Sequence, residues 1–120
     1  MVSKIWGPDR QDIIWIDFNP QVEREMKDMP PFLMLSPKAF NARTRIVIGS
    51  PVTASPSNES NPFAVNSIGE KGKASYILAH QPKSFDWQYR AAKPHPWKKV
   101  PLEIMSLAGN LLNQIITIGD

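Results

Sequence analysis

Cysteine is absent from the chain, which excludes disulfide bonds and thiolate metal sites. No apolar stretch comes near the ~20 residues that a membrane-spanning helix needs. The first ten residues, MVSKIWGPDR, contain one lysine and lack the apolar core of a signal peptide. We therefore expect a protein that works in the cytoplasm and makes no use of a membrane.

Standard nucleotide and metal motifs are also missing. The chain has no glycine-rich phosphate loop, and its two histidines, His80 and His95, are too far apart for an HxxxH pair. No nucleophile-elbow motif supports a Ser-His-Asp triad. We expect no cofactor and no metal ion.

What is present indicates one globular domain over residues 1–120, since 42% of the residues are hydrophobic and 21% are charged. The net charge is +3, and basic residues concentrate in residues 83–99, KSFDWQYRAAKPHPWKK. Cations interleaved with aromatic rings suit single-stranded nucleic acid, whose phosphates need charge and whose bases stack on flat side chains. The alternative is a solvated basic loop whose aromatic rings turn into the core.

Runs of β-branched and aromatic residues predict strands. They cover residues 12–18, 32–36, 45–55, 63–68 and 74–80, and the last two are expected to form a hairpin. Pro30 and Pro31 should deliver an extended chain into the second strand. Pro51 argues for an edge or a bulge in the third strand. Residues 37–43 are expected to be a simple connection.

Residues beyond Pro101 predict an amphipathic helix, because their apolar side chains recur every three or four positions. These residues are Ile104, Leu107, Ala108, Leu111, Leu112, Ile115 and Ile116. Gly119 is a plausible stop. The predicted fold class is therefore mostly β: five or six strands in a small antiparallel barrel, with a C-terminal helix packed across it.

Polar residues at the predicted strand ends suggest a catalytic rim. They are Asp17, Asn19, Glu25, Thr53, Gln81, Lys83 and Ser84. Cleaving RNA there requires a base for the 2′-hydroxyl proton, an acid for the leaving 5′-oxygen, and donors for the charge on phosphorus. Glu25 could be the base and Thr53 a donor.

Six segments in order resemble the MazF/PemK (Kid) family of bacterial toxin endoribonucleases. They are DIIWIDFNPQ (12–21), PFLMLSPKAFN (31–41), SPVTAS (50–55), NPFAV (61–65), LAHQPKSFDW (78–87) and VP (100–101), with Glu25 in the loop after the first. The resemblance implies an SH3-like β-barrel homodimer with a C-terminal helix. It also implies metal-independent, sequence-specific cleavage of single-stranded mRNA to a 2′,3′-cyclic phosphate and a 5′-hydroxyl.

The resemblance further implies a cognate antitoxin protein, with operator DNA bound only through the toxin–antitoxin complex. It gives the catalytic roles to Thr53, at the scissile phosphate, and to Glu25. It places five residues near the RNA path and the dimer interface: Gln81, Lys83, Ser84, Trp87 and Arg90.

The chain departs from the family pattern where a catalytic arginine is expected, because that position is Pro30. Arg24, Lys27 and His80 are candidate replacements. Two interpretations follow. Either the chain is an active or attenuated endoribonuclease, or it is a catalytically silent relative that binds RNA or antitoxin as a regulator.

Dimer contacts are the last expectation. Trp6, Met26, Met29 and the apolar face of the helix could form an exposed patch that pairs with a second copy. The alternative is that all of them pack in one monomer core.

Overall fold

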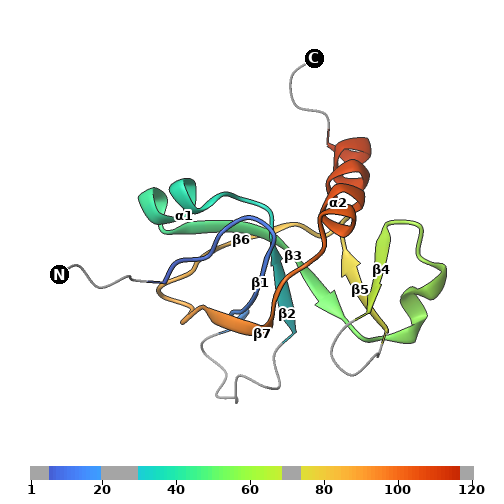
Figure 1. Cartoon of the computed structure of the whole chain (residues 1–120), viewed down its shortest axis with the longest axis horizontal. Coiled ribbons are helices and arrows are strands. Elements are labelled where there is room, and N and C mark those ends of the chain that lie inside the picture. Colours follow the sequence, from blue (N-terminus) through green and yellow to red (C-terminus); the bar gives the residue numbers. More distant parts are fainter. Residues whose placement is uncertain (1–5, 20–29, 69–73, 117–120) are drawn as a thin grey trace.

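The computed structural model describes residues 6–19, 30–68 and 74–116. Seven strands and two α-helices follow in chain order (Figure 1). They are β1 (Asp12–Trp15), β2 (Pro31–Met34), α1 (Lys38–Thr44), β3 (Ile46–Thr53), the 3-10 helix η2 (Pro56–Ser60), β4 (Ala64–Ile68), β5 (Ala74–Leu78), β6 (Lys83–Asp86), β7 (Lys93–Lys99) and α2 (Leu102–Ile115). No helix in these three ranges is long and apolar enough to cross a membrane.

The strands are antiparallel and lie in the order β4-β5-β3-β2-β1-β7, with β6 beside β3. The mostly β fold with a C-terminal helix is confirmed. Closure into a barrel is wrong for the described part of the chain, because the order ends at β4 and β7 without a pairing between them. The described ranges contain seven strands rather than five or six, because β6 and β7 lie within the stretch 83–99.

Strand β3 connects the two halves of the fold (Figure 1). Its first half pairs with β6 from Ile46 to Gly49, and its last two residues, Val52 and Thr53, pair with β5. Pro51 lies between these two stretches and faces Phe32 of β2 on the other side. Of the two alternatives that Pro51 suggested, an edge or a bulge, the edge is wrong, since β3 has β2 on one side and β6 and β5 on the other. A proline, which cannot donate to a sheet, is tolerated where the strand changes partners.

The predicted hairpin is confirmed, with β4 and β5 paired from Ala64↔Leu78 to Ile68↔Ala74. The pair Pro30-Pro31 does lead into a strand, since β2 begins at Pro31. Residues 37–43 are not a simple connection, because α1 occupies residues 38–44. Asn41 explains this helix: it is fully buried and its amide donates to the carbonyls of Pro8 and Ser36 at 2.8 and 3.0 Å.

Two apolar clusters form the core. One contains Ile13, Leu33, Val52, Val65 and Ile77 and is covered by α2 through Ile104, Ala108 and Leu111. The other lies around Ile14, Phe32 and Val47, with Trp6 and Trp87 packed against it. The predicted helix is confirmed, but Leu107 and Ile115 are exposed. Gly119, Met26 and Met29 lie outside the described residues.

Candidate active site

Thr53 is the last residue of β3, and strand register defines its neighbours. On β5 its partner is Tyr76. On β2 the pairs are Met34↔Gly49, Leu33↔Ser50 and Phe32↔Pro51. Continuing this register by two residues brings Pro30, just before β2, opposite Thr53. On this continued register, the position where the family arginine is expected would flank Thr53, and in this chain it is Pro30.

The Thr53 side chain points away from α2. Val52 directly precedes Thr53, and Ile77 directly follows Tyr76. Both Val52 and Ile77 belong to the core cluster under α2. Because successive side chains of a strand point to opposite faces, Thr53 and Tyr76 project together on the other face. The Thr53 Oγ1 accepts a hydrogen bond from the backbone N–H of Ser55 at 3.2 Å, so its own proton is not used in that bond.

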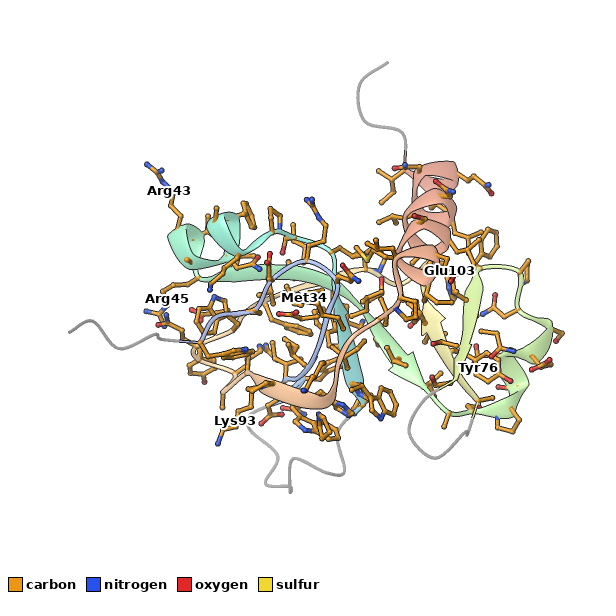
Figure 2. The ribbon with its side chains drawn as sticks, viewed as in Figure 1. Met34, Arg43, Arg45, Tyr76, Lys93 and Glu103 are labelled. Carbon is orange, nitrogen blue, oxygen red and sulfur yellow. The ribbon has the colours of Figure 1, made fainter. Side chains whose placement is uncertain are left out.

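Tyr76 and Glu59 form a polar pair beside Thr53. Figure 2 shows Tyr76 in the half of the fold that contains β4 and β5. Tyr76 is 4% exposed, and its hydroxyl donates to the Glu59 carboxylate on η2. That hydrogen bond, together with burial and the charge of Glu59, raises the pKa of Tyr76. Sequence reasoning missed both residues. The predicted hairpin put Tyr76 in a strand, but no pattern showed that this strand pairs with the end of β3.

Of the other predicted catalytic residues, the structure describes only His80. Glu25, Arg24 and Lys27 lie outside the described residues. His80 lies in the turn that follows β5, beyond Leu78. Its ring packs near Phe63, with centroids 5.9 Å apart, and its Nε2 lies 3.3 Å from the Gln81 amide nitrogen.

The five predicted RNA-binding residues separate into two groups. Gln81, Lys83 and Ser84 are exposed. Trp87 and Arg90 are half-buried and hold the fold together.

Trp87 Nε1 donates to the Asn41 carbonyl at 2.9 Å. Arg90 Nη1 donates to the carbonyls of Asp17 and Phe18 at 3.1 and 2.5 Å, and its guanidinium lies over the Phe85 ring at 4.5 Å. The basic stretch, residues 83–99, therefore contains the strands β6 and β7, and some of its aromatic rings pack against the core.

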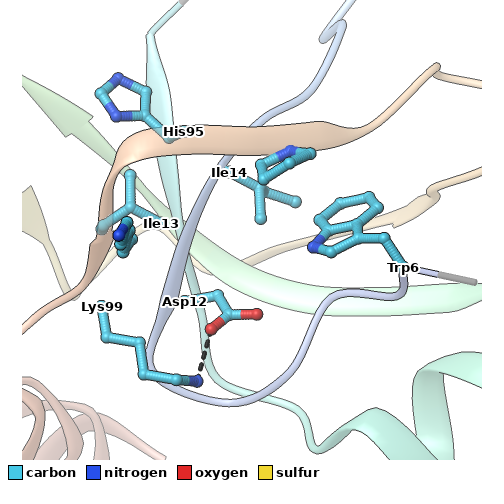
Figure 3. A pocket seen from close by; sticks show the side chains of 8 residues that line it. Trp6, Asp12, Ile13, Ile14, His95 and Lys99 are labelled. Atoms are coloured by element: carbon cyan, nitrogen blue, oxygen red, sulfur yellow. Dashed lines mark hydrogen bonds and ion pairs between the residues drawn. The ribbon is translucent and has the colours of Figure 1, made fainter. Parts of the chain in front are cut away.

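A separate cavity of about 170 Å³ lies between β1 and β7, at the register shift after Asp12 (Figure 3). Asp12 and Lys99 form an ion pair of 2.5 Å in its wall, and His95 lies at its edge. The His95 ring packs against the Trp15 ring at a tilt of 43°, with centroids 4.2 Å apart. Because the Asp12 and Lys99 charges neutralise each other, we place the candidate active site at Thr53 instead. Nowhere in the described ranges do three His, Asp or Glu side chains gather as a metal site.

Comparisons with known proteins agree with this architecture. The family described as "PemK-like, MazF-like toxin of type II toxin-antitoxin system" matches residues 9–116. The endoribonuclease toxin MazF of Escherichia coli (strain K12) is 35% identical over 92 residues, which cover 77% of this chain and 79% of that protein.

Solved structures are similar as well. A crystal structure of MazF from Deinococcus radiodurans matches with a TM-score of 0.78 at 27% identity, over 95% of this chain and all of that one. The fold also matches a MazE–MazF complex from Deinococcus radiodurans, with a TM-score of 0.78 at 24% identity over 96% of this chain and all of that one. The chain therefore belongs to the PemK-like, MazF-like family of toxins from type II toxin–antitoxin systems.

Proposed function

We propose that this chain is the toxin of its system and acts as a metal-independent, sequence-specific endoribonuclease on single-stranded mRNA in the cytoplasm, as one domain over residues 1–120. The observation that carries the proposal is Thr53 at the end of β3, with its hydroxyl proton unused in the bond from Ser55, in a chain 35% identical to a named endoribonuclease. The Thr53 hydroxyl donates to a non-bridging oxygen of the scissile phosphate. Attack by the 2′-oxygen then gives a 2′,3′-cyclic phosphate and a 5′-hydroxyl.

The remaining roles rest on the resemblance. Glu25 is the base that it assigns, and Arg24, Lys27 and His80 are the candidates for the charge-stabilising cation. Removing one preorganised donor from such a site costs about 3 kcal/mol, or 10²–10³ in rate. With Pro30 beside Thr53, we expect slower cleavage than an arginine-containing site would give.

The exposed side chains of Gln81, Lys83 and Ser84 make the proposed contact with RNA. Lys83 pairs with Gly49, near the middle of β3 and four residues before Thr53, so the RNA would run along the second half of this strand. Trp87 and Arg90 would support that surface from within rather than touch bases.

Two partners complete the proposal. The first is a second copy of the chain, for which α2 offers Leu102, Leu107 and Ile115, which are 71%, 51% and 45% exposed. The second is a cognate antitoxin, through which the complex would bind operator DNA.

One observation favours a second candidate, a silent relative that binds RNA or antitoxin without cutting. Thr53 has no charged residue beside it on the neighbouring strands that the structure describes: its partner on β5 is Tyr76, and continuing the register of β2 places Pro30 on the other side.

Cleavage of a long single-stranded RNA in EDTA decides between the two. The purified protein is compared with Pro30→Arg and with Thr53→Val as the matched inactive control. Cleavage by the unmodified protein that is lost in Thr53→Val supports the proposed enzyme. Cleavage by Pro30→Arg alone indicates a silent site on a working scaffold, and cleavage by neither supports the regulator.

A further inference from the structure

The pair Glu59–Tyr76 lies on the flank of Thr53 away from Pro30. Thr53 and Tyr76 are direct cross-strand partners, and such partners have Cβ atoms about 4.5–5.5 Å apart. Tyr76 is buried and donates its hydroxyl proton to Oε2 of Glu59. A carboxylate is therefore tied directly to the side chain that stands next to the catalytic threonine.

Short-range hydrogen bonds bring Glu59 back to this place. After β3 ends, the N–H of Ser55 bonds to Thr53 Oγ1, and the N–H and side-chain amide of Asn58 both bond to the Ser55 carbonyl at 3.2 and 3.3 Å. The N–H of Asn61 then bonds to the Asn58 carbonyl at 3.1 Å. These bonds fold η2 back beside the end of β3, and the exposed Glu59 side chain accepts the hydrogen bond from Tyr76 there.

We propose that Glu59, held in place by Tyr76, is the general base of this site in place of Glu25, the base that the resemblance assigns, and that the Glu59 carboxylate contacts the 2′-hydroxyl of the nucleotide whose 3′-phosphate is bound by Thr53. The inference rests on the proposed function. The Glu59 carboxylate takes the 2′-hydroxyl proton while the bond from 2′-oxygen to phosphorus forms. The bond from phosphorus to the 5′-oxygen breaks, the leaving oxygen takes a proton from water, and Glu59 returns its proton to solvent.

The chemistry of the pair suits this role. An ionised carboxylate is an acceptor with two oxygens, and Tyr76 engages Oε2, so Oε1 can accept from a second hydroxyl. The 2′-hydroxyl and the 3′-phosphate sit on adjacent ribose carbons, which places the proton to be removed a few ångströms from the phosphate on Thr53. Because its pKa is raised, Tyr76 stays protonated and keeps donating to Glu59 through neutral pH. Tyr76 is thus a positioning residue.

Single-turnover cleavage of single-stranded RNA in EDTA, measured from pH 5 to 9, tests the inference. We compare Glu59→Gln, Glu59→Asp, Tyr76→Phe and Glu25→Gln with the unmodified protein, and Glu103→Gln is the matched control on α2. Loss of a general base lowers the rate by about 10²–10⁴-fold, and we expect this of Glu59→Gln, together with loss of the rise in rate with pH on the acid side. Glu59→Asp should recover part of the loss.

Tyr76→Phe should be less severe and should retain the acid-side rise, because the carboxylate remains while its position is less well defined. Thermal unfolding of each variant separates lost chemistry from lost folding. A Glu59→Gln rate within threefold of the unmodified protein overturns the inference, most directly if Glu25→Gln is inactive, and leaves the proposed function standing. If only Pro30→Arg cleaves RNA, the same comparison is made in that background. If neither cleaves, the proposed function and this inference both fail.

Discussion

Gly49 is the position where we expect one added methyl group to damage the fold most. A β-carbon at residue 49 would lie 2.3 Å from the carbonyl oxygen of Leu33 and 2.5 Å from Cε2 of Phe32. Neither atom can move away easily, because the Leu33 oxygen belongs to the backbone of β2 and the Phe32 side chain is fully buried. Gly49 is also paired on both sides, with Met34 on β2 and Lys83 on β6.

The cost of Gly49→Ala follows from these contacts. Overpacking costs about 1–3 kcal/mol, and opening a buried ladder hydrogen bond adds about 1–3 kcal/mol for the group left unpaired. We expect the free energy of unfolding to fall by about 3–5 kcal/mol, a large share of the roughly 5–15 kcal/mol of a typical domain. Urea unfolding of the purified variant measures this.

The two other described glycines serve as controls. A β-carbon added to Gly109, on α2, would have no atom within 4 Å, and one added to Gly7 would meet only Lys38 Cε at 3.7 Å. Gly109→Ala should raise the free energy of unfolding by about 0.5–1 kcal/mol, because alanine is the better helix former, and Gly7→Ala should change it little. A loss below about 1 kcal/mol for Gly49→Ala would refute the argument from close approach.

Three further predictions concern a buried amide, a carboxylate and the threonine. Asn41→Ala should lower the free energy of unfolding by about 3 kcal/mol in urea, because buried partners lose their bonds; a loss below about 1 kcal/mol contradicts this. The backbone N–H of Tyr89, with further help from Arg45, lowers the pKa of Asp86. A pKa that is lower in the folded state gives stability that is present above the unfolded value, near 4, and lost as the pH falls through the folded value. Asp86→Asn should therefore flatten the acid side of the stability–pH curve, and an unchanged curve would show that the contacts of Asp86 do not matter. Thr53→Val should lower RNA cleavage by about 10²-fold with an unchanged melting temperature, whereas a parallel fall in both would indicate a structural role.

Local patterns were enough to predict the hairpin of β4 and β5 and the helix α2, since their periodicities of two and 3.6 residues are strong. They were not enough for β7, whose Pro94 and Pro96 argue against a strand. An edge strand tolerates prolines because one side needs no ladder bonds, and β7 ends the sheet. The helix α1 was missed because its buried Asn41, rather than an apolar stripe, holds it in place.

The site was harder to predict because it depends on register. Thr53 followed from the resemblance, but its neighbours did not. Tyr76 lies 23 positions later in the sequence, and only the pairing of β3 with β5 brings it beside Thr53. Pro30 lies 23 positions earlier and aligns with Thr53 only when the register of β2 and β3 is continued by two residues. The position of Glu59 depends on its hydrogen bond with Tyr76, which the periodicity of the sequence does not predict. Trp87, whose aromatic character suggested a base-stacking role, is half-buried and packs against the core, which its sequence position did not predict.

The pairing of β1 with β7 has a consequence for synthesis of the protein. The two strands are separated by about 80 residues, which a ribosome takes about 4–16 s to add at about 5–20 residues per second. During that time β1 can pair with β2, but its second neighbour, β7, has not yet been synthesised. A chain whose translation stops before residue 93 cannot assemble the complete sheet, so the finished fold becomes available only near the end of translation.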